Sequence, residues 1–228
     1  MKDLRPAIIA AHEAGRGVRE IARHQLTMEF DCPRIALIGE PGVGKTCLVN
    51  RYVNNTFDEQ FTCRRHFVTK DIIIGNIPAN ILVWDDEYPE PPGGPDRTKL
   101  YLSVDCCALT FDVTNAASFV ALDKCRARCL RPESISEWGD LPLVVLANKI
   151  DDTANRVVTP TQVQEYCLSL GIPYFEVSAK ESTNIEDAFD IITRKALARS
   201  IQRGPSPSFP DLPRWRKTKE KRNLCSWC

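Results

Sequence analysis

The chain has 228 residues, which fits one α/β domain of average size with additional segments at its ends. Apolar residues make up 43% and charged residues 26%, the proportions of an ordinary globular protein with a hydrophobic core. The formal net charge is zero, so no overall electrostatic field favours nucleic acid or another strongly charged partner.

The ten cysteines are not spaced like a disulfide framework. Cys106 and Cys107 lie in an apolar run, Cys47 follows a glycine-rich segment, and Cys125 and Cys129 fall on one predicted helix. Cysteines at core positions favour a reducing compartment.

The first 30 residues lack the apolar stretch of a signal peptide. No run approaches the roughly 18 apolar residues of a membrane span, so we expect any membrane contact to use an anchor.

Apolar runs and amphipathic segments alternate along the chain. We expect strands at 34–39, 71–75, 80–85, 105–112, 141–147 and 173–178, and helices near 45–55, 115–130, 160–169 and 184–201. Segments 71–75 and 80–84 are typical of an antiparallel hairpin. Alternation of strands and helices predicts an α/β fold, with a mostly parallel sheet and helices on both faces.

Three segments fall outside this pattern, which leaves a predicted core domain at 33–202. Residues 1–32 are expected to form a helical or disordered extension. Residues 86–96 carry four prolines and two glycines, which exclude a regular helix. Residues 203–228 are rich in proline and serine and then basic, as in a flexible tail.

The first predicted strand runs into Gly39-Glu-Pro-Gly-Val-Gly-Lys-Thr46, and a helix follows. Glycines let successive N–H groups turn inward around an anion, and the helix N-terminus adds a positive partial charge. Lys45 can reach the β- and γ-phosphates, and the Thr46 hydroxyl can ligate Mg²⁺. A chance glycine-rich turn is the alternative. The expected phosphate-binding residues are Gly39, Gly42, Val43, Gly44, Lys45, Thr46 and Cys47.

Asn148-Lys-Ile-Asp151 follows directly on the strand at 141–147, at the end where open α/β sheets bind ligands. The Asp151 carboxylate can accept hydrogen bonds from N1–H and N2–H₂ of guanine, a donor pair that adenine lacks. Asn148 can tie this loop to the phosphate loop, and the Ala179 N–H can meet guanine O6. A simple polar turn is the alternative. The expected guanine-binding residues are Asn148, Lys149, Asp151, Ser178, Ala179 and Lys180.

Together with these motifs, the segments 51–54, 67–71, 105–114 and 172–180 make residues 33–201 resemble a Rab-type small GTPase of the Ras superfamily. They are most similar to its late-endosomal and vacuolar branch. The resemblance implies a P-loop NTPase fold with a six-stranded sheet, bound GTP or GDP, and Mg²⁺. It also implies a monomer in vesicle traffic, with effector and exchange proteins as partners. Its expected location is the cytoplasm and the late endosome, lysosome or vacuole membrane.

The chain departs from this family in the two segments that sense the γ-phosphate. In the first, Thr62 takes the metal-ligating position under one alignment, and Arg64 takes it under another. In the second, Asp85 remains and can hold a Mg²⁺ water, but Tyr88 replaces the usual glycine. Pro89 replaces the glutamine that orients the attacking water, so no catalytic residue is assigned. We expect GTP hydrolysis to be very slow or absent.

The C-terminus combines a basic run at 214–222 with Cys225 and Cys228. In the family, such terminal cysteines carry geranylgeranyl groups, and a basic run attracts anionic lipid. An unmodified, solvated tail is the alternative. The two cysteines could also be half of a zinc site, but no partner ligands lie nearby in the sequence.

Residues 8–23 resemble the opening of a helix-turn-helix but stop before a recognition helix. We expect a packed or disordered extension there, and no nucleic-acid partner. Two function classes therefore remain: a GTP/GDP switch, and a protein that holds nucleotide structurally without cycling, as an interaction protein.

Overall fold

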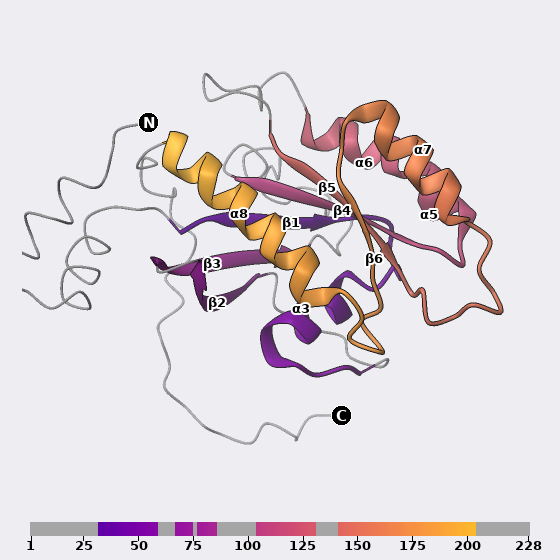
Figure 1. The fold of residues 1–228 in the computed structure, drawn as a ribbon, viewed down its shortest axis with the longest axis horizontal. Helices are drawn as coiled ribbons and strands as arrows, with labels where there is room; N and C mark the ends of the chain where they lie inside the picture. The colour runs from indigo at the N-terminus through magenta and orange to yellow at the C-terminus, as the bar shows by residue number, and fades with distance from the viewer. Residues whose placement is uncertain (1–31, 59–66, 75–76, 86–103, 131–140, 204–228) are drawn as a thin grey trace, which may run out of the picture.

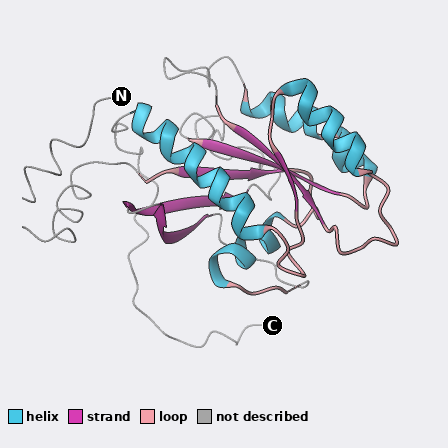
Figure 2. Ribbon diagram, viewed as in Figure 1, coloured by secondary structure: helices cyan, strands magenta, loops and turns pink. Residues whose placement is uncertain are grey.

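The computed structural model describes residues 32–58, 67–74, 77–85, 104–130 and 141–203, drawn in colour in Figure 1. Figure 2 shows strands in the middle and helices on either side. The strands are β1 (Arg34–Ile38), β2 (Phe67–Ile74), β3 (Ile77–Asp85), β4 (Cys106–Asp112), β5 (Leu143–Asn148) and β6 (Tyr174–Glu176). The helices are α3 (Lys45–Asn54), α5 (Ala116–Val120), α6 (Leu122–Cys129), α7 (Pro160–Leu170) and α8 (Ile185–Arg203).

The six strands form one sheet in the order β2-β3-β1-β4-β5-β6. Only the β2–β3 pair is antiparallel. The predicted α/β class, six-stranded sheet and hairpin are therefore confirmed. The hairpin is longer than expected, because pairing continues back to Phe67, which lies opposite Trp84.

Every residue of β1, β4 and β5 is buried, as expected for parallel strands that are covered on both faces. Successive residues alternate between two hydrophobic clusters: Ile35 and Leu37 of β1 belong to one, Ala36 and Ile38 to the other. This alternation explains why the sequence reads as unbroken apolar runs.

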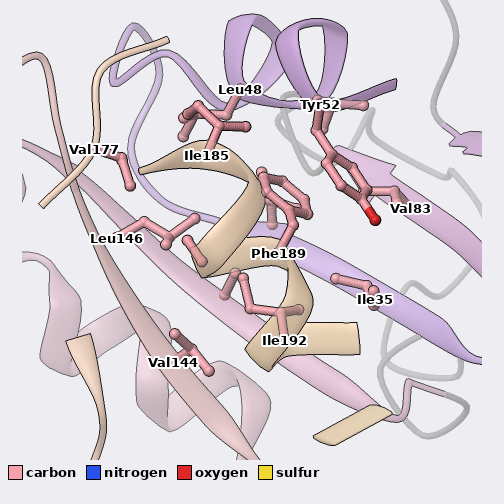
Figure 3. Packing of buried hydrophobic residues seen from close by; sticks show 14 of the residues in the cluster. Ile35, Leu48, Tyr52, Val83, Val144, Leu146, Val177, Ile185, Phe189 and Ile192 are labelled. Carbon is pink, nitrogen blue, oxygen red and sulfur yellow. The ribbon is translucent and has the colours of Figure 1, made fainter. Parts of the chain in front are cut away.

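Helices α3 and α8 cover one face of the sheet, and α6 and α7 cover the other. Figure 3 shows the α8 side, where Tyr52 of α3 stacks on Phe189 of α8. Their ring centroids lie 4.1 Å apart and the rings are tilted by 10°. This contact fixes α3 against α8 and so anchors the helix that follows the phosphate loop.

The helix predicted at 115–130 is interrupted at one residue. Ala121 separates α5 from α6, yet its N–H donates to the Ala117 carbonyl and its own carbonyl accepts from Cys125 N. The break is thus local, and the hydrogen-bond ladder passes through it. In contrast, α7 is regular and has a capping box between Thr159 and Gln162, Pro160 in its first turn and Gly171 at its end.

The seven cysteines in the described residues are free thiols, and five of them are buried. Burial raises the pKa of the Cys106 thiol to about 12 and that of Cys167 to about 11. These side chains therefore stay protonated at neutral pH and act as small apolar groups. Within the described ranges, no helix combines the length and apolarity needed to cross a membrane.

Candidate nucleotide-binding site

The phosphate loop that begins at Gly39 and the loop that begins at Asn148 both lie at the carboxyl edge of the sheet. The chain leaves β1 for the loop 39–44, and β1 lies between β3 and β4, where the strand order reverses direction. Ligands of open α/β sheets bind in the crevice at such a point. The loops after β5 and β6 begin at the same edge, because these strands run parallel to β1 and β4.

The glycines of the phosphate loop are required by the structure at two positions. Gly44 has φ 93°, and a Cβ there would lie 2.4 Å from Asn148 Nδ2. A Cβ on Gly39 would lie 2.1 Å from the Thr110 carbonyl oxygen of β4. A side chain at either position would collide with the neighbouring strand end, so the close approach of these loops depends on glycine.

The first residues of α3 point into the same loop. Lys45 is 1% exposed, and its Nζ donates to the carbonyls of Gly39 (3.1 Å) and Glu40 (3.0 Å). Its ammonium is thus held over the turn that the loop makes. Thr46 is buried one residue later, in the first turn of the helix, where the backbone N–H groups of a helix are available to an anion.

Asn148 joins the phosphate loop to the two loops expected to bind the base, which are residues 148–151 after β5 and 178–180 after β6 and are called the base loops below. It is 1% exposed, and its Nδ2 donates to the Val43 carbonyl at 2.9 Å. Its Oδ1 accepts from the Ala179 N–H at 3.3 Å. One amide therefore spans residues from three loops, which confirms the expected link between Asn148 and the phosphate loop.

Lys149 lies across the same edge in a left-handed backbone conformation, with φ 67°. Its Nζ donates to the Gly42 carbonyl at 2.9 Å and pairs with Asp112 Oδ2 at 2.7 Å. Asp112 ends β4, and its Oδ1 accepts from both the backbone N–H and the hydroxyl of Thr114. The ion pair with Asp112 fixes the end of the lysine and therefore the direction of its aliphatic stem.

Asp151 and Ser178 form a second contact between the loops that follow β5 and β6. The Ser178 hydroxyl donates to Asp151 Oδ1 at 2.6 Å and accepts from the Glu181 N–H at 2.9 Å. The carboxylate is thereby oriented while lone pairs on both oxygens remain for further donors. Lys180, the last of the expected guanine-binding residues, has an exposed side chain and contributes its carbonyl to a contact with Arg51.

Comparison with known proteins agrees with this arrangement. Residues 34–198 match the model of the Ras family. The chain is 37% identical over 187 residues to the Ypt/Rab-type GTPase ypt7 of Pyricularia oryzae, which covers 78% of this chain and 88% of the relative. The chain belongs to the Ras family. Within it, the similarity is to Rab-type members of the late-endosomal branch.

Two further relatives of this Ras-family chain come from other organisms. The GTP-binding protein yptV5 of Volvox carteri is 40% identical over 173 residues, which cover 72% of this chain and 82% of the relative. The Ras-related protein Rab-7a of Paramecium octaurelia is 38% identical over 172 residues, or 73% of this chain and 82% of the relative.

Ras-family GTPases bind GTP and GDP, typically with Mg²⁺. The described residues fit such a ligand, because Gly39 and Gly44 leave no room for a Cβ and Lys45 is buried beside a helix N-terminus. No group of three metal-binding side chains occurs in the described part of the chain.

The expected metal residues are only partly placed. Thr46 lies in the first turn of α3, and Asp85 ends β3 opposite Leu37 of β1, at the phosphate-loop edge. Thr62, Tyr88, Pro89, Cys225 and Cys228 lie outside the described residues, as do Arg64, the N-terminal extension up to residue 31 and the tail from residue 204.

Sequence reasoning missed two residues that support the site, Asp112 and Arg51. Asp112 had one available signal, its place at the carboxyl end of a buried strand next to the phosphate loop. Arg51 had none, because it contacts residues 128 and 129 positions away.

Proposed function

We propose that this chain is a guanine-nucleotide-binding, Rab-type protein that acts in vesicle and endosomal membrane traffic. The Rab7-type and Ypt7-type relatives support the Rab class. Its core domain spans 33–202, between an N-terminal extension and a C-terminal tail, which agrees with the family match at 34–198. The protein is a monomer whose partners are effector and exchange proteins.

The observation that carries the proposal is the position of Asn148. Its side chain contacts Val43 in the phosphate loop and Ala179 in the base loop at once. Phosphate and base recognition are therefore mechanically joined, as a single nucleotide that spans both would require. A polar turn without a ligand would need no buried amide between three loops.

Each residue at this edge has a distinct part in binding. Lys45 and the N–H groups of 42–47 take the phosphates, with Thr46 as a metal ligand and Asp85 acting through water. Mg²⁺ neutralises phosphate charge when it is bound. The Asp151 carboxylate accepts from N1–H and N2–H₂, the Lys149 stem covers the base, and the Ala179 N–H takes O6. ADP would leave Asp151 without these donors, so we expect at least about a hundredfold preference for GDP.

GTP hydrolysis by this protein is very slow or absent. The reason is in the sequence, where Tyr88 and Pro89 stand at the family positions of a glycine and the water-orienting glutamine. Water positioning is a main source of rate in these enzymes, and turnover without an activator is already on the order of 10⁻⁴ s⁻¹. Single-turnover hydrolysis of bound GTP tests this, and a rate at or above that level contradicts it.

A non-cycling nucleotide-binding protein that acts as a scaffold is the second candidate, favoured by the same two positions. Affinities for mant-GTP and mant-GDP, each with and without Mg²⁺, separate it from a switch. Equal affinities in all conditions would exclude switching by occupancy, because a ligand without differential affinity shifts no equilibrium. A preference that depends on Mg²⁺ and the γ-phosphate would instead support the switch.

We further propose a cytoplasmic protein that reaches the late-endosomal, lysosomal or vacuolar membrane through prenylated Cys225 and Cys228. The basic run at 214–222 supports this, since each such residue near an anionic leaflet adds about 1 kcal/mol. Detergent partitioning of the chain from cells is the test, with a Cys225→Ser/Cys228→Ser variant as control. Equal partitioning of both would rule out the anchor.

A further inference from the structure

Arg51 lies one turn before the end of α3, and its guanidinium contacts the loop that follows β6. Its Nε donates to the Ala179 carbonyl at 2.8 Å, and its Nη2 donates to the Lys180 carbonyl at 2.9 Å. A guanidinium presents its donors in a fixed planar fork, so two bonds to adjacent carbonyls fix both position and orientation. Two successive peptide groups of this loop are thereby held from the α3 side.

The third nitrogen of the same guanidinium is held by its own helix end. Nη1 donates to the Asn55 carbonyl at 3.1 Å, and the Phe57 ring lies 5.9 Å from Cζ. Asn55 is the left-handed residue that ends α3. The Arg51 side chain is therefore oriented by its own helix end, which lowers the conformational entropy lost in its contact with the loop.

The opposite side of this loop faces the base-reading residues. The Ala179 N–H donates to Asn148 Oδ1 at 3.3 Å, which is longer than a typical N–H···O bond. Ser178 is held by Asp151 from that side. The segment 178–180 is thus clamped between Arg51 and the residues that we assign to guanine.

We propose that Arg51 is a positioning residue for guanine recognition, which orients the Ala179 N–H toward O6 of the base. The inference rests on the proposed function, because it concerns the same ligand. Arg51 is six residues after Lys45 on one helix, roughly 9 Å along its axis. It therefore sets the base loop at a fixed distance from the phosphate loop.

The experiment compares three diphosphates on the full chain: GDP, IDP and 6-thio-GDP. IDP keeps O6 but lacks the 2-amino group, and 6-thio-GDP replaces O6 with sulfur, a weaker acceptor. We expect Arg51→Gln to weaken GDP and IDP about tenfold each and 6-thio-GDP about twofold, because the bond that Arg51 orients is already impaired there. The GDP/6-thio-GDP affinity ratio falls, and the GDP/IDP ratio does not change.

Arg194→Gln is the matched control, because Arg194 is an exposed arginine of α8 that pairs only with Asp190 among the described residues. It should change none of the three affinities. Thermal unfolding checks that each variant folds. If Arg51→Gln does not fold, the same comparison on Arg51→Lys decides, since lysine keeps the charge but lacks the planar fork that holds two carbonyls in one fixed orientation.

Equal weakening of all three diphosphates by the Arg51 variant would overturn the proposal and make Arg51 a general support of the pocket. No weakening would overturn it as well. If the unaltered chain bound GDP no better than ADP, the proposed function itself would fail, and that result is visible before any variant is compared.

Discussion

The phosphate loop and the base loops are held in place by different means. The phosphate loop depends on backbone: two of its glycines pack where no Cβ fits, and a lysine binds its carbonyls. The base loops depend on side chains that bond outside their own element. Asn148 reaches the phosphate loop, Ser178 bonds to Asp151 of the neighbouring loop, and Arg51 reaches from α3. Asn148 is the residue at which the two regions meet.

This difference predicts different responses to mutation. Adding one Cβ to the phosphate loop should disrupt its whole backbone conformation, because the Cβ would meet the Thr110 carbonyl or the buried Asn148 amide. In the base loops, a substitution removes one side-chain hydrogen bond and leaves the others in place. Each substitution should therefore change the affinities for different nucleotides in its own way.

Gly44→Ala should abolish nucleotide binding, with at least about a thousandfold loss of affinity for GTP and GDP alike. An L-residue at φ 93° is strained by about 1–2 kcal/mol, and its Cβ would displace the Asn148 amide, which is buried and bonded. Equilibrium binding of mant-GDP measures the loss.

Gly171→Ala is the matched control for this glycine. Its φ is 65°, but no atom lies within 4 Å of the added Cβ, and it ends α7 away from the loops. We expect a loss of about 1 kcal/mol in the free energy of unfolding and unchanged GDP affinity. Similar nucleotide losses in both variants would refute the idea of a tightly fitted cradle.

Asp151→Asn should change which base binds without weakening the phosphate subsite. An amide cannot accept from both N1–H and N2–H₂ of guanine, but it can donate to the carbonyl that xanthine carries at position 2. We expect about a hundredfold weaker GDP and a gain for XDP, measured by competition against mant-nucleotide. Equal weakening of both diphosphates would mean that Asp151 holds the loop through Ser178 and does not read the base.

The sequence predicted the fold well, for a physical reason. Parallel strands buried on both faces are apolar throughout, so β1, β4 and β5 are visible as runs. The Gly39–Thr46 and Asn148–Asp151 motifs are contiguous, because each is one loop after one strand. Their contact through Asn148 was expected from the place of this residue directly after a strand, and the structure shows the bond to Val43.

The supporting contacts were not predictable in the same way. Arg51 meets Ala179 across 128 positions, and Arg156 meets Glu176 across 20, so neither pair leaves a local pattern. The break at Ala121 was also missed, because residues 115–130 keep a helical pattern through it. Such features depend on packing between elements, which a single sequence does not specify.

Asp112→Asn should moderately weaken GDP binding, through the contact of Lys149 with the base. It removes the ion pair with Lys149 but keeps an acceptor for Thr114. The Lys149 side chain is 39% exposed, so solvent screens the pair, and we expect GDP to dissociate only about three- to tenfold faster. Asp123→Asn on α6 removes a carboxylate from the surface and is the control. No change in mant-GDP dissociation would show that the Gly42 carbonyl alone fixes Lys149.

Glu176→Gln should give the smallest effect on nucleotide and a measurable one on stability. Glu176 of β6 receives both Nη groups of Arg156, whose Nε donates to the Val158 carbonyl at 2.7 Å. Both side chains are less than one third exposed, so we expect a loss of about 1–2 kcal/mol in the free energy of unfolding. Asp190→Asn breaks the exposed pair with Arg194, which solvent screens, and should cost clearly less than Glu176→Gln. Urea unfolding with and without GDP measures both. A loss of GDP affinity as large as that of the Arg51 variant would mean that this pair belongs to the base-reading network and is not merely a brace for β6.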